Sequence, residues 1–102
     1  MSSTLSTHVL DTVRGRPAVG VAVELHHGGA LVASLKTDGD GRARFGDITP
    51  GTYELAFAVG DYFGEAPFLD VVPIRFTVAE GASHYHVPLL VSPWSYSTYR
   101  GS

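Results

Sequence analysis

The sequence contains no cysteine, and none of its apolar runs is long. Without cysteine, the chain cannot form a disulfide framework, a reactive thiolate or a Cys-ligated zinc site. No stretch approaches the roughly 20 apolar residues that span a bilayer, and the N-terminus lacks the charged and apolar regions of a signal peptide. We therefore predict a cytoplasmic protein that has no membrane anchor.

Positive charge is also scarce, because only seven lysines and arginines are scattered along the 102 residues and the net charge is −3. No basic stripe is available to neutralise a phosphate backbone, so nucleic acid is excluded as a partner. Apolar residues make up 44% of the chain and charged residues 17%, a balance that is typical of a packed globule. The length predicts a single domain over 1–102.

Apolar and polar residues alternate in several short runs, as they do in strands that have one face on a core. The clearest runs are 20–27, 53–59, 74–78 and 84–91. Turn sequences rich in Gly, Asp and Pro separate the runs, at 27–29, 38–41, 49–51, 79–81 and 92–93. Seven or eight strands with this spacing predict an all-β sandwich or barrel, and the only helix candidate is a turn or two around 60–67.

Two histidines stand two residues apart in the last clear run, so His84 and His86 point to the same side of a strand. Apolar side chains take the other side, which predicts that both imidazoles face away from the core. Pro88 interrupts the hydrogen-bond ladder on the histidine side and suggests an edge or an interface. The pair is compatible with two surface residues, with half of a metal site that lacks its third ligand, or with an active site.

His8 lies in another candidate strand, and Arg42 follows the tight turn Asp38-Gly39-Asp40-Gly41. Each alone is typical of a solvated surface residue. Together with His86 they form a chemically useful set, because neutral imidazoles take protons near neutral pH and a guanidinium binds planar anions. The turn is not a calcium loop, since Thr49 stands where an EF-hand requires glutamate.

Four segments resemble one enzyme family, the 5-hydroxyisourate hydrolases, which are transthyretin-like proteins of purine catabolism. The resemblance is carried by LSTHVLDT at 5–12, GRPA at 15–18, TDGDGR at 37–42 and HYHVPLLVSPWSYSTYRGS at 84–102. The terminal motif Tyr99-Arg100-Gly101-Ser102 is the most specific of these. The loop 61–73 fits the family loosely, and Trp94 replaces what is more often a smaller aromatic residue.

This resemblance implies a transthyretin-like (prealbumin-like) sandwich of two four-stranded sheets with one short helix. It also implies a homotetramer whose active sites lie at the interface between dimers. The implied reaction is the hydrolysis of 5-hydroxyisourate to 2-oxo-4-hydroxy-4-carboxy-5-ureidoimidazoline in urate degradation, without metal or cofactor. By motif position, the catalytic residues are His8, Arg42 and His86, with either histidine or both activating the water. The implied substrate-binding residues are Ser97, Tyr99, Arg100, Gly101 and Ser102.

Two other functions share this architecture. Hormone-carrying transthyretins have lysine, glutamate and threonine where this chain has His8, Arg42 and His86, and they lack the Tyr-Arg-Gly-Ser ending. Structural β-sandwich modules resemble the segments 37–45 and 50–55, but they have no need of the histidine-bearing terminal motif. The residue types therefore favour the enzyme over the carrier and the structural module.

Overall fold

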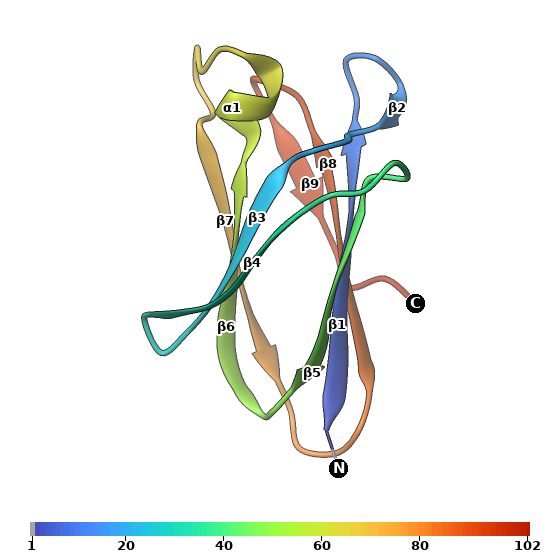
Figure 1. Ribbon diagram of the computed structural model, residues 1–102, viewed down its shortest axis with the longest axis vertical. Helices are drawn as coiled ribbons and strands as arrows, with labels where there is room; N and C mark the ends of the chain where they lie inside the picture. The colour runs from blue at the N-terminus through green and yellow to red at the C-terminus, as the bar shows by residue number, and fades with distance from the viewer. Residues whose placement is uncertain (1) are drawn as a thin grey trace.

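The computed structural model describes residues 2–102, whose strands lie in two layers with a short helix at one end (Figure 1). The elements are β1 (Ser3–Asp11), β2 (Arg16–Pro17), β3 (Ala22–His27), β4 (Ala30–Lys36), β5 (Arg42–Ile48), β6 (Gly51–Ala58), α1 (Val59–Phe63), β7 (Val71–Val78), β8 (His84–Val91) and β9 (Tyr96–Thr98). Within this part of the chain, no helix is long and apolar enough to cross a membrane.

The strands form two sheets, which confirms the predicted sandwich. One sheet has the order β2-β1-β8-β9, and β5 pairs with β1 on the same side as β2. The other sheet has the order β4-β3-β6-β7. The two-residue β2 extends the first sheet to five strands, where the prediction had four. Most neighbouring strands are antiparallel, but β1 and β8 are parallel although they are about 80 residues apart in the sequence.

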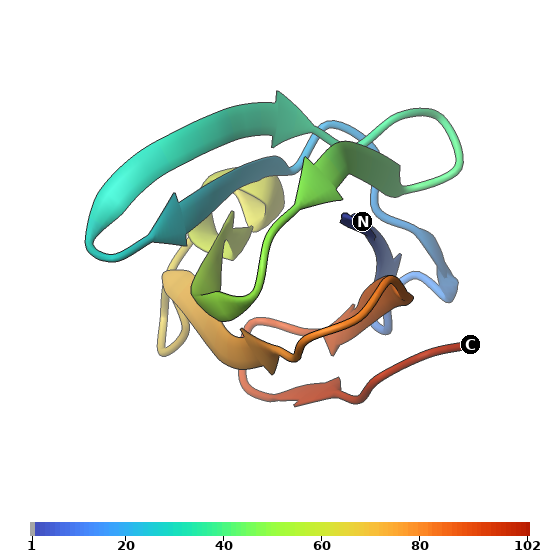
Figure 2. The same ribbon diagram turned by 90° about the horizontal axis from the view of Figure 1, so that it is seen from below.

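The two sheets face each other (Figure 2), and the buried apolar side chains form one core cluster. Alternation builds it, because every second side chain of a strand points to the same face. In β8, Tyr85, Val87 and Leu89 are buried as predicted, and in β6 Leu55 and Phe57 are completely buried. The opposite face of each sheet is thereby left for polar side chains, and on the β1–β8 sheet this outer face holds the predicted catalytic residues.

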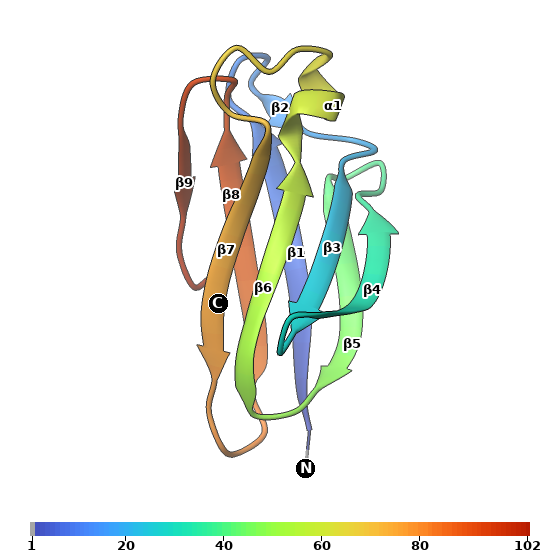
Figure 3. The ribbon, with the colours of Figure 1, turned by 90° about the vertical axis from the view of Figure 1, so that its left-hand side faces the viewer.

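Two elements differ from the sequence expectations. The strand β4 forms one edge of its sheet (Figure 3), and nearly all of its residues are exposed. No alternation marks it in the sequence, because neither of its faces is buried in the chain. At the other edge, β7 begins at Val71, inside the expected loop 61–73, and contains Pro73. A proline is tolerated there because an edge strand has one row of unpaired N–H groups.

Pro88 does not lie at a sheet edge, so of the two predicted settings, an edge or an interface, the edge was wrong. β8 is an interior strand between β1 and β9, and Pro88 is buried opposite His8 of β1. The carbonyl of Pro88 accepts a hydrogen bond of 2.7 Å from the hydroxyl of Thr98 on β9. This bond satisfies the Pro88 carbonyl and ties β9 to β8, but it does not replace the N–H that proline lacks.

The short helix α1 falls within the segment where the sequence predicted one, and it is tied to the end of β1. Tyr62 donates a 2.7 Å hydrogen bond to Oδ2 of the buried Asp11, and Arg14 donates to the same oxygen at 2.8 Å. Burial raises the pKa of Asp11, but hydrogen bonds from Arg14, Tyr62 and the Val13 amide outweigh it and leave the pKa below its ordinary value. The carboxylate thus stays charged and holds the helix in place.

Candidate active site

The three predicted catalytic side chains lie on the outer face of neighbouring strands. His8 of β1 is directly opposite Arg42 of β5, and on the other side of β1, Ser6 is opposite His86 of β8. Alternation puts Ser6, His8, Arg42 and His86 on the same face, because the residues next to each of them point into the core. Segments far apart in the sequence are therefore joined into one polar surface.

His8 is half-buried and held by a backbone carbonyl. Its Nε2 lies 2.8 Å from the carbonyl oxygen of Asp40. A carbonyl only accepts, so this nitrogen carries the proton, and in the neutral ring the lone pair is on Nδ1. Among residues 2–102 no hydrogen-bond partner occupies Nδ1, which leaves it free to accept a proton or a hydrogen bond from a bound water.

A tight turn fixes the start of β5 and with it Arg42. The carboxylate of Asp38 accepts the backbone N–H groups of Asp40 at 2.9 Å and of Arg42 at 3.0 Å, which lowers the pKa of Asp38. Gly41 has a φ of +75° and lies so close to β1 that an added Cβ would be 2.6 Å from the carbonyl oxygen of Val9. Only glycine fits at this point, and the exposed guanidinium of Arg42 follows directly.

His86 is half-buried between β1 and the C-terminal segment. Its Nδ1 lies 2.8 Å from the hydroxyl of Ser6, and its carbonyl accepts the N–H of Gly101 at 2.7 Å. The ring packs against Gly101 so closely that a Cβ there would be 2.6 Å from Cδ2. Nε2 has no hydrogen-bond partner within residues 2–102, so it is the nitrogen available for chemistry.

The surroundings of His86 keep its ring neutral. Burial lowers the pKa of His86, and the positive charge of Arg42 lowers it further, with smaller effects of His84 and His8. A hydrogen bond with the backbone of Ser6 acts in the opposite direction and is outweighed. The imidazole therefore keeps its lone pair at a pH below the usual value of about 6.5, which suits a general base.

The predicted substrate-binding residues occupy different places around this triplet. Ser97 is opposite Leu90 on β8, on the outer face, and Gly101 is bridged to His86. Tyr99 and Ser102 are exposed, and the C-terminus lies outside the β1–β8 layer (Figure 1). The side chain of Arg100 makes its contacts at the start of β8.

The guanidinium of Arg100 lies 4.1 Å above the ring of Tyr85 and donates to Ser83 Oγ at 2.9 Å and to the His84 carbonyl at 3.3 Å. Tyr85 belongs to the core side of β8. Within one chain, therefore, Arg100 holds the terminal segment against β8, and its charge is directed away from the imidazole of His86.

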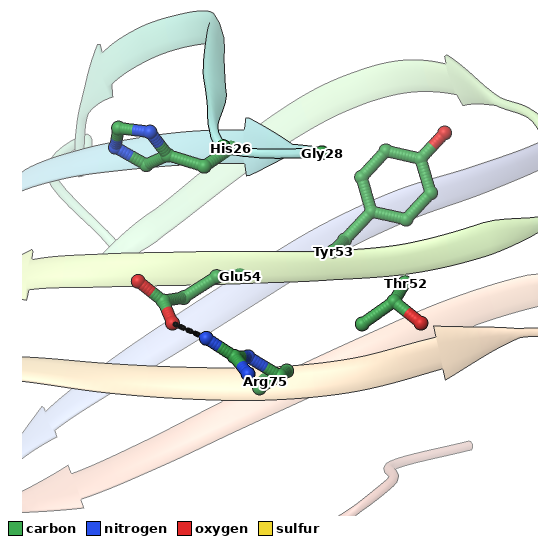
Figure 4. A pocket seen from close by; sticks show the side chains of 7 residues that line it. His26, Gly28, Thr52, Tyr53, Glu54 and Arg75 are labelled. Atoms are coloured by element: carbon green, nitrogen blue, oxygen red, sulfur yellow. Dashed lines mark hydrogen bonds and ion pairs between the residues drawn. The ribbon is translucent and has the colours of Figure 1, made fainter.

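A hollow of about 410 Å³ lies on the other sheet and is lined by His26, Gly28, Gly29, Thr52, Tyr53, Glu54 and Arg75 (Figure 4). Its two charged side chains are paired, because Arg75 contacts Glu54 at 3.4 Å, and Nε2 of His26 lies 3.0 Å from a carboxylate oxygen of Glu24. None of the predicted site residues borders it. The triplet and this hollow lie on different sheets of the sandwich, so the triplet stays a candidate site that the hollow does not test.

Sequence reasoning missed the role of Ser6 and left His84 without one. Ser6 bridges the two rings, with His84 Nε2 at 2.9 Å and His86 Nδ1 at 2.8 Å. The spacing of Thr4, Ser6 and His8 is the signal that could have found it, because these residues share one face of β1. The rival metal site gains no support, since no group of three His, Asp or Glu within residues 2–102 could hold an ion.

The sequence pattern of the HIUase/transthyretin family matches residues 5–101. This chain belongs to that family. It is 50% identical to the 5-hydroxyisourate hydrolase of Deinococcus radiodurans, over 96% of this chain and 95% of that protein. It is 48% identical to 5-hydroxyisourate hydrolase 2 of Rhizobium meliloti, over 99% of this chain and 98% of the relative.

Solved structures of the HIUase/transthyretin family have the same fold. The 5-hydroxyisourate hydrolase of Klebsiella pneumoniae superimposes with a TM-score of 0.89 at 40% identity, over 98% of this chain and 94% of that one. Sea bream transthyretin in complex with thyroxine superimposes with a TM-score of 0.85 at 32% identity, over 95% and 93%. The predicted transthyretin-like fold and the family resemblance are both confirmed.

Proposed function

We propose that this protein hydrolyses 5-hydroxyisourate to 2-oxo-4-hydroxy-4-carboxy-5-ureidoimidazoline, a step of urate degradation. The observation that carries the proposal is the placement of His8, Arg42 and His86 on one face, with each imidazole anchored at one ring nitrogen and His86 kept neutral. Relatives of nearly the same length, about half identical in sequence, are hydrolases of this substrate.

Arg42 binds the substrate in this proposal. 5-Hydroxyisourate carries ring carbonyl oxygens that accept hydrogen bonds, and a guanidinium can bind them with its fixed fork of donors. Because Arg42 also lies close enough to His86 to lower its pKa, the bound substrate and the base are neighbours. The same guanidinium stabilises negative charge that develops on the carbonyl oxygen, where one preorganised donor is commonly worth about 10²-fold or more in rate.

His86 acts as the general base through Nε2, and His8 orients the same water by accepting a hydrogen bond at Nδ1. Nε2 of His86 takes one proton from water, and the remaining hydroxide bonds to the ring carbonyl carbon. The C–N bond then breaks, and the departing ring nitrogen takes the proton back from Nε2. Water is consumed, His86 returns to its neutral state, and no metal or cofactor takes part.

The residue types in the triplet favour a hydrolase over a carrier. A site that only binds has no need of two imidazoles, each with one nitrogen anchored and the other free, beside a cation that lowers a pKa. The structure of sea bream transthyretin in complex with thyroxine shows that the same fold can bind a hormone. Tight thyroxine binding without turnover is therefore the outcome that would favour the carrier.

We propose further that the active form is a homotetramer in which two dimers face each other across the β1–β8 sheets. Arg42 is exposed and His8 and His86 are only half-buried in the single chain, so the triplet lies on an open face. A second copy placed over this face would exclude bulk water and enclose the substrate. Light scattering after gel filtration should give four chains; a monomer with full activity would contradict this proposal.

The function is tested with freshly made substrate, which urate oxidase generates from urate directly in the cuvette. The ultraviolet absorbance of the substrate is followed with this protein and without it. We expect the protein to accelerate the decay in proportion to its concentration, over the spontaneous rate. Decay at the spontaneous rate at all protein concentrations would refute the proposed function.

A further inference from the structure

Four side chains on the outer face of β1 and β8 form a continuous hydrogen-bonded chain that ends at His86. Thr4 Oγ1 lies 2.6 Å from His84 Nδ1, His84 Nε2 lies 2.9 Å from Ser6 Oγ, and Ser6 Oγ lies 2.8 Å from His86 Nδ1. The parallel register explains the arrangement, because Thr4 is opposite His84 and Ser6 is opposite His86. The two imidazole planes are nearly parallel, at 17°.

The hydroxyl of Ser6 couples the two rings, because it has one hydrogen and two imidazole partners. It donates to one ring nitrogen and accepts an N–H from the other. When His86 carries its proton on Nδ1, Ser6 accepts it and donates to Nε2 of His84. When His84 carries a proton on Nε2, Ser6 donates to His86 instead, and the lone pair of His86 points at Ser6.

Only the first arrangement leaves His86 with a lone pair on Nε2, the nitrogen that has no partner in the chain. The neutral ring of His84 then carries its proton on Nδ1, from which it donates to Thr4. The reverse direction satisfies the same three contacts, but it places the proton of His86 on Nε2, where the ring cannot act as a base. A histidine base needs a partner on its second nitrogen to fix its tautomer and to stabilise the imidazolium that forms during the reaction.

We propose that Ser6 and His84 are positioning residues that hold His86 in the tautomer protonated on Nδ1, with Nε2 free as the base. Ser6 fixes the ring directly, and His84 acts through Ser6 by accepting its hydrogen. Thr4 completes the chain at the more exposed end, since His84 is exposed and Ser6 is buried. The hydrogen bonds couple the two rings, and the proposed hydrolase function selects the direction, because a base needs its lone pair on Nε2; the inference rests on that function for this choice and for its kinetic consequences.

The tautomer is read by NMR in protein labelled with ¹⁵N in its histidines, at a pH where the rings are neutral. We expect the proton of His86 on Nδ1 in the wild type, and a shift toward the form protonated on Nε2 in S6A and H84A. S6T keeps the hydroxyl and should restore the wild-type tautomer. His86 protonated mainly on Nε2 in the wild type, or unaltered in S6A, would overturn the inference.

Kinetics supply the second readout. S6A should lower kcat by about 10-fold or more and leave KM within about 2-fold, because an interaction that orients the base affects the transition state more than substrate binding. S6T should recover most of the rate, and S34A on β4 of the other sheet is the matched serine control, with wild-type kcat. Equal kcat in S6A and the wild type would also overturn the inference.

The proposed function and the role of Ser6 can be refuted separately. A wild-type protein without hydrolase activity refutes the proposed function, and the NMR experiment then still decides whether Ser6 sets the tautomer of His86. A wild-type protein that hydrolyses the substrate, combined with S6A at full kcat, leaves the function standing and removes the role of Ser6. If S6A fails to fold, H84A still tests the inference, because His84 is exposed and its replacement should leave the fold intact.

Discussion

Replacing Gly101 by alanine tests whether the C-terminal segment sets the position of the base. The new Cβ would lie 2.6 Å from Cδ2 of His86 and 3.3 Å from Cγ of Pro88. Carbon atoms in contact prefer about 3.5 Å, so the approach is roughly 0.9 Å too short and the imidazole has to retreat. Pro88 is a rigid ring in an interior strand, and the displacement therefore falls on His86.

A displacement of about 1 Å at a catalytic group commonly costs on the order of 10²-fold in rate. We expect G101A to lose about that much kcat, measured with freshly generated 5-hydroxyisourate. The backbone of Gly101 is not in the left-handed region, so alanine is compatible with it and thermal unfolding should change little. A large loss of activity in a stable protein is thus the expected signature.

The matched control is G39A, which also adds one methyl group to a glycine whose φ is not positive, but with nothing within 4 Å of the new Cβ. It should keep its activity within about 2-fold of the wild type. If G101A hydrolyses the substrate at the wild-type rate, or if both variants lose activity equally, the steric reasoning about His86 is wrong.

Three further predictions concern charge and backbone geometry. In R42Q the pKa of His86 should rise toward its ordinary value, since the charge of Arg42 lowers it; an NMR titration of the ring that gives an unaltered pKa would contradict this. D11N should lose about 1–3 kcal/mol of stability at neutral pH, because the buried carboxylate accepts charge-assisted hydrogen bonds that an amide makes more weakly. The bond from the hydroxyl of Tyr62 is one of them. The pKa of Asp11 is lowered in the folded state, so the carboxylate stabilises the fold fully above the unfolded pKa of about 3.9 and loses this effect as the pH falls below that value. The free energies of unfolding of wild type and D11N, measured in urea, should therefore become equal in acid. A difference that stays constant with pH would refute the assignment. G41A should lower the free energy of unfolding by at least about 1–2 kcal/mol, because alanine is strained in the left-handed backbone conformation of Gly41. Thermal unfolding measures this loss.

The sequence predicts those parts of the fold in which local pattern and burial agree. β6 and β8 alternate cleanly because one face of each lies on the core, and their buried residues are the expected ones. β4 has no such pattern, because it is an exposed edge strand whose position is set by its pairing with β3. The start of β7 at Val71 and the two-residue β2 likewise depend on partner strands that no local pattern reveals.

The candidate site is predictable in its members but not in its contacts. Alternation alone turns His86 away from the core, and family resemblance adds His8 and Arg42. Their proximity follows from the pairing of β1 with both β5 and β8, which joins segments more than 30 residues apart and leaves no local signal. The bridging role of Ser6 needs that same parallel register, since the hydroxyl reaches two rings at once only across neighbouring strands.

In the proposed mechanism His8 and His86 use their free nitrogens on one water. The most direct measurement is the rate at which freshly generated 5-hydroxyisourate disappears with wild-type, H86N and H8N protein at equal concentration. We predict that H86N loses at least about 10²-fold, as expected for removal of a general base, that H8N is also impaired, and that both variants keep the wild-type fold. Hydrolysis by a folded H86N protein at a rate close to that of the wild type would contradict the account.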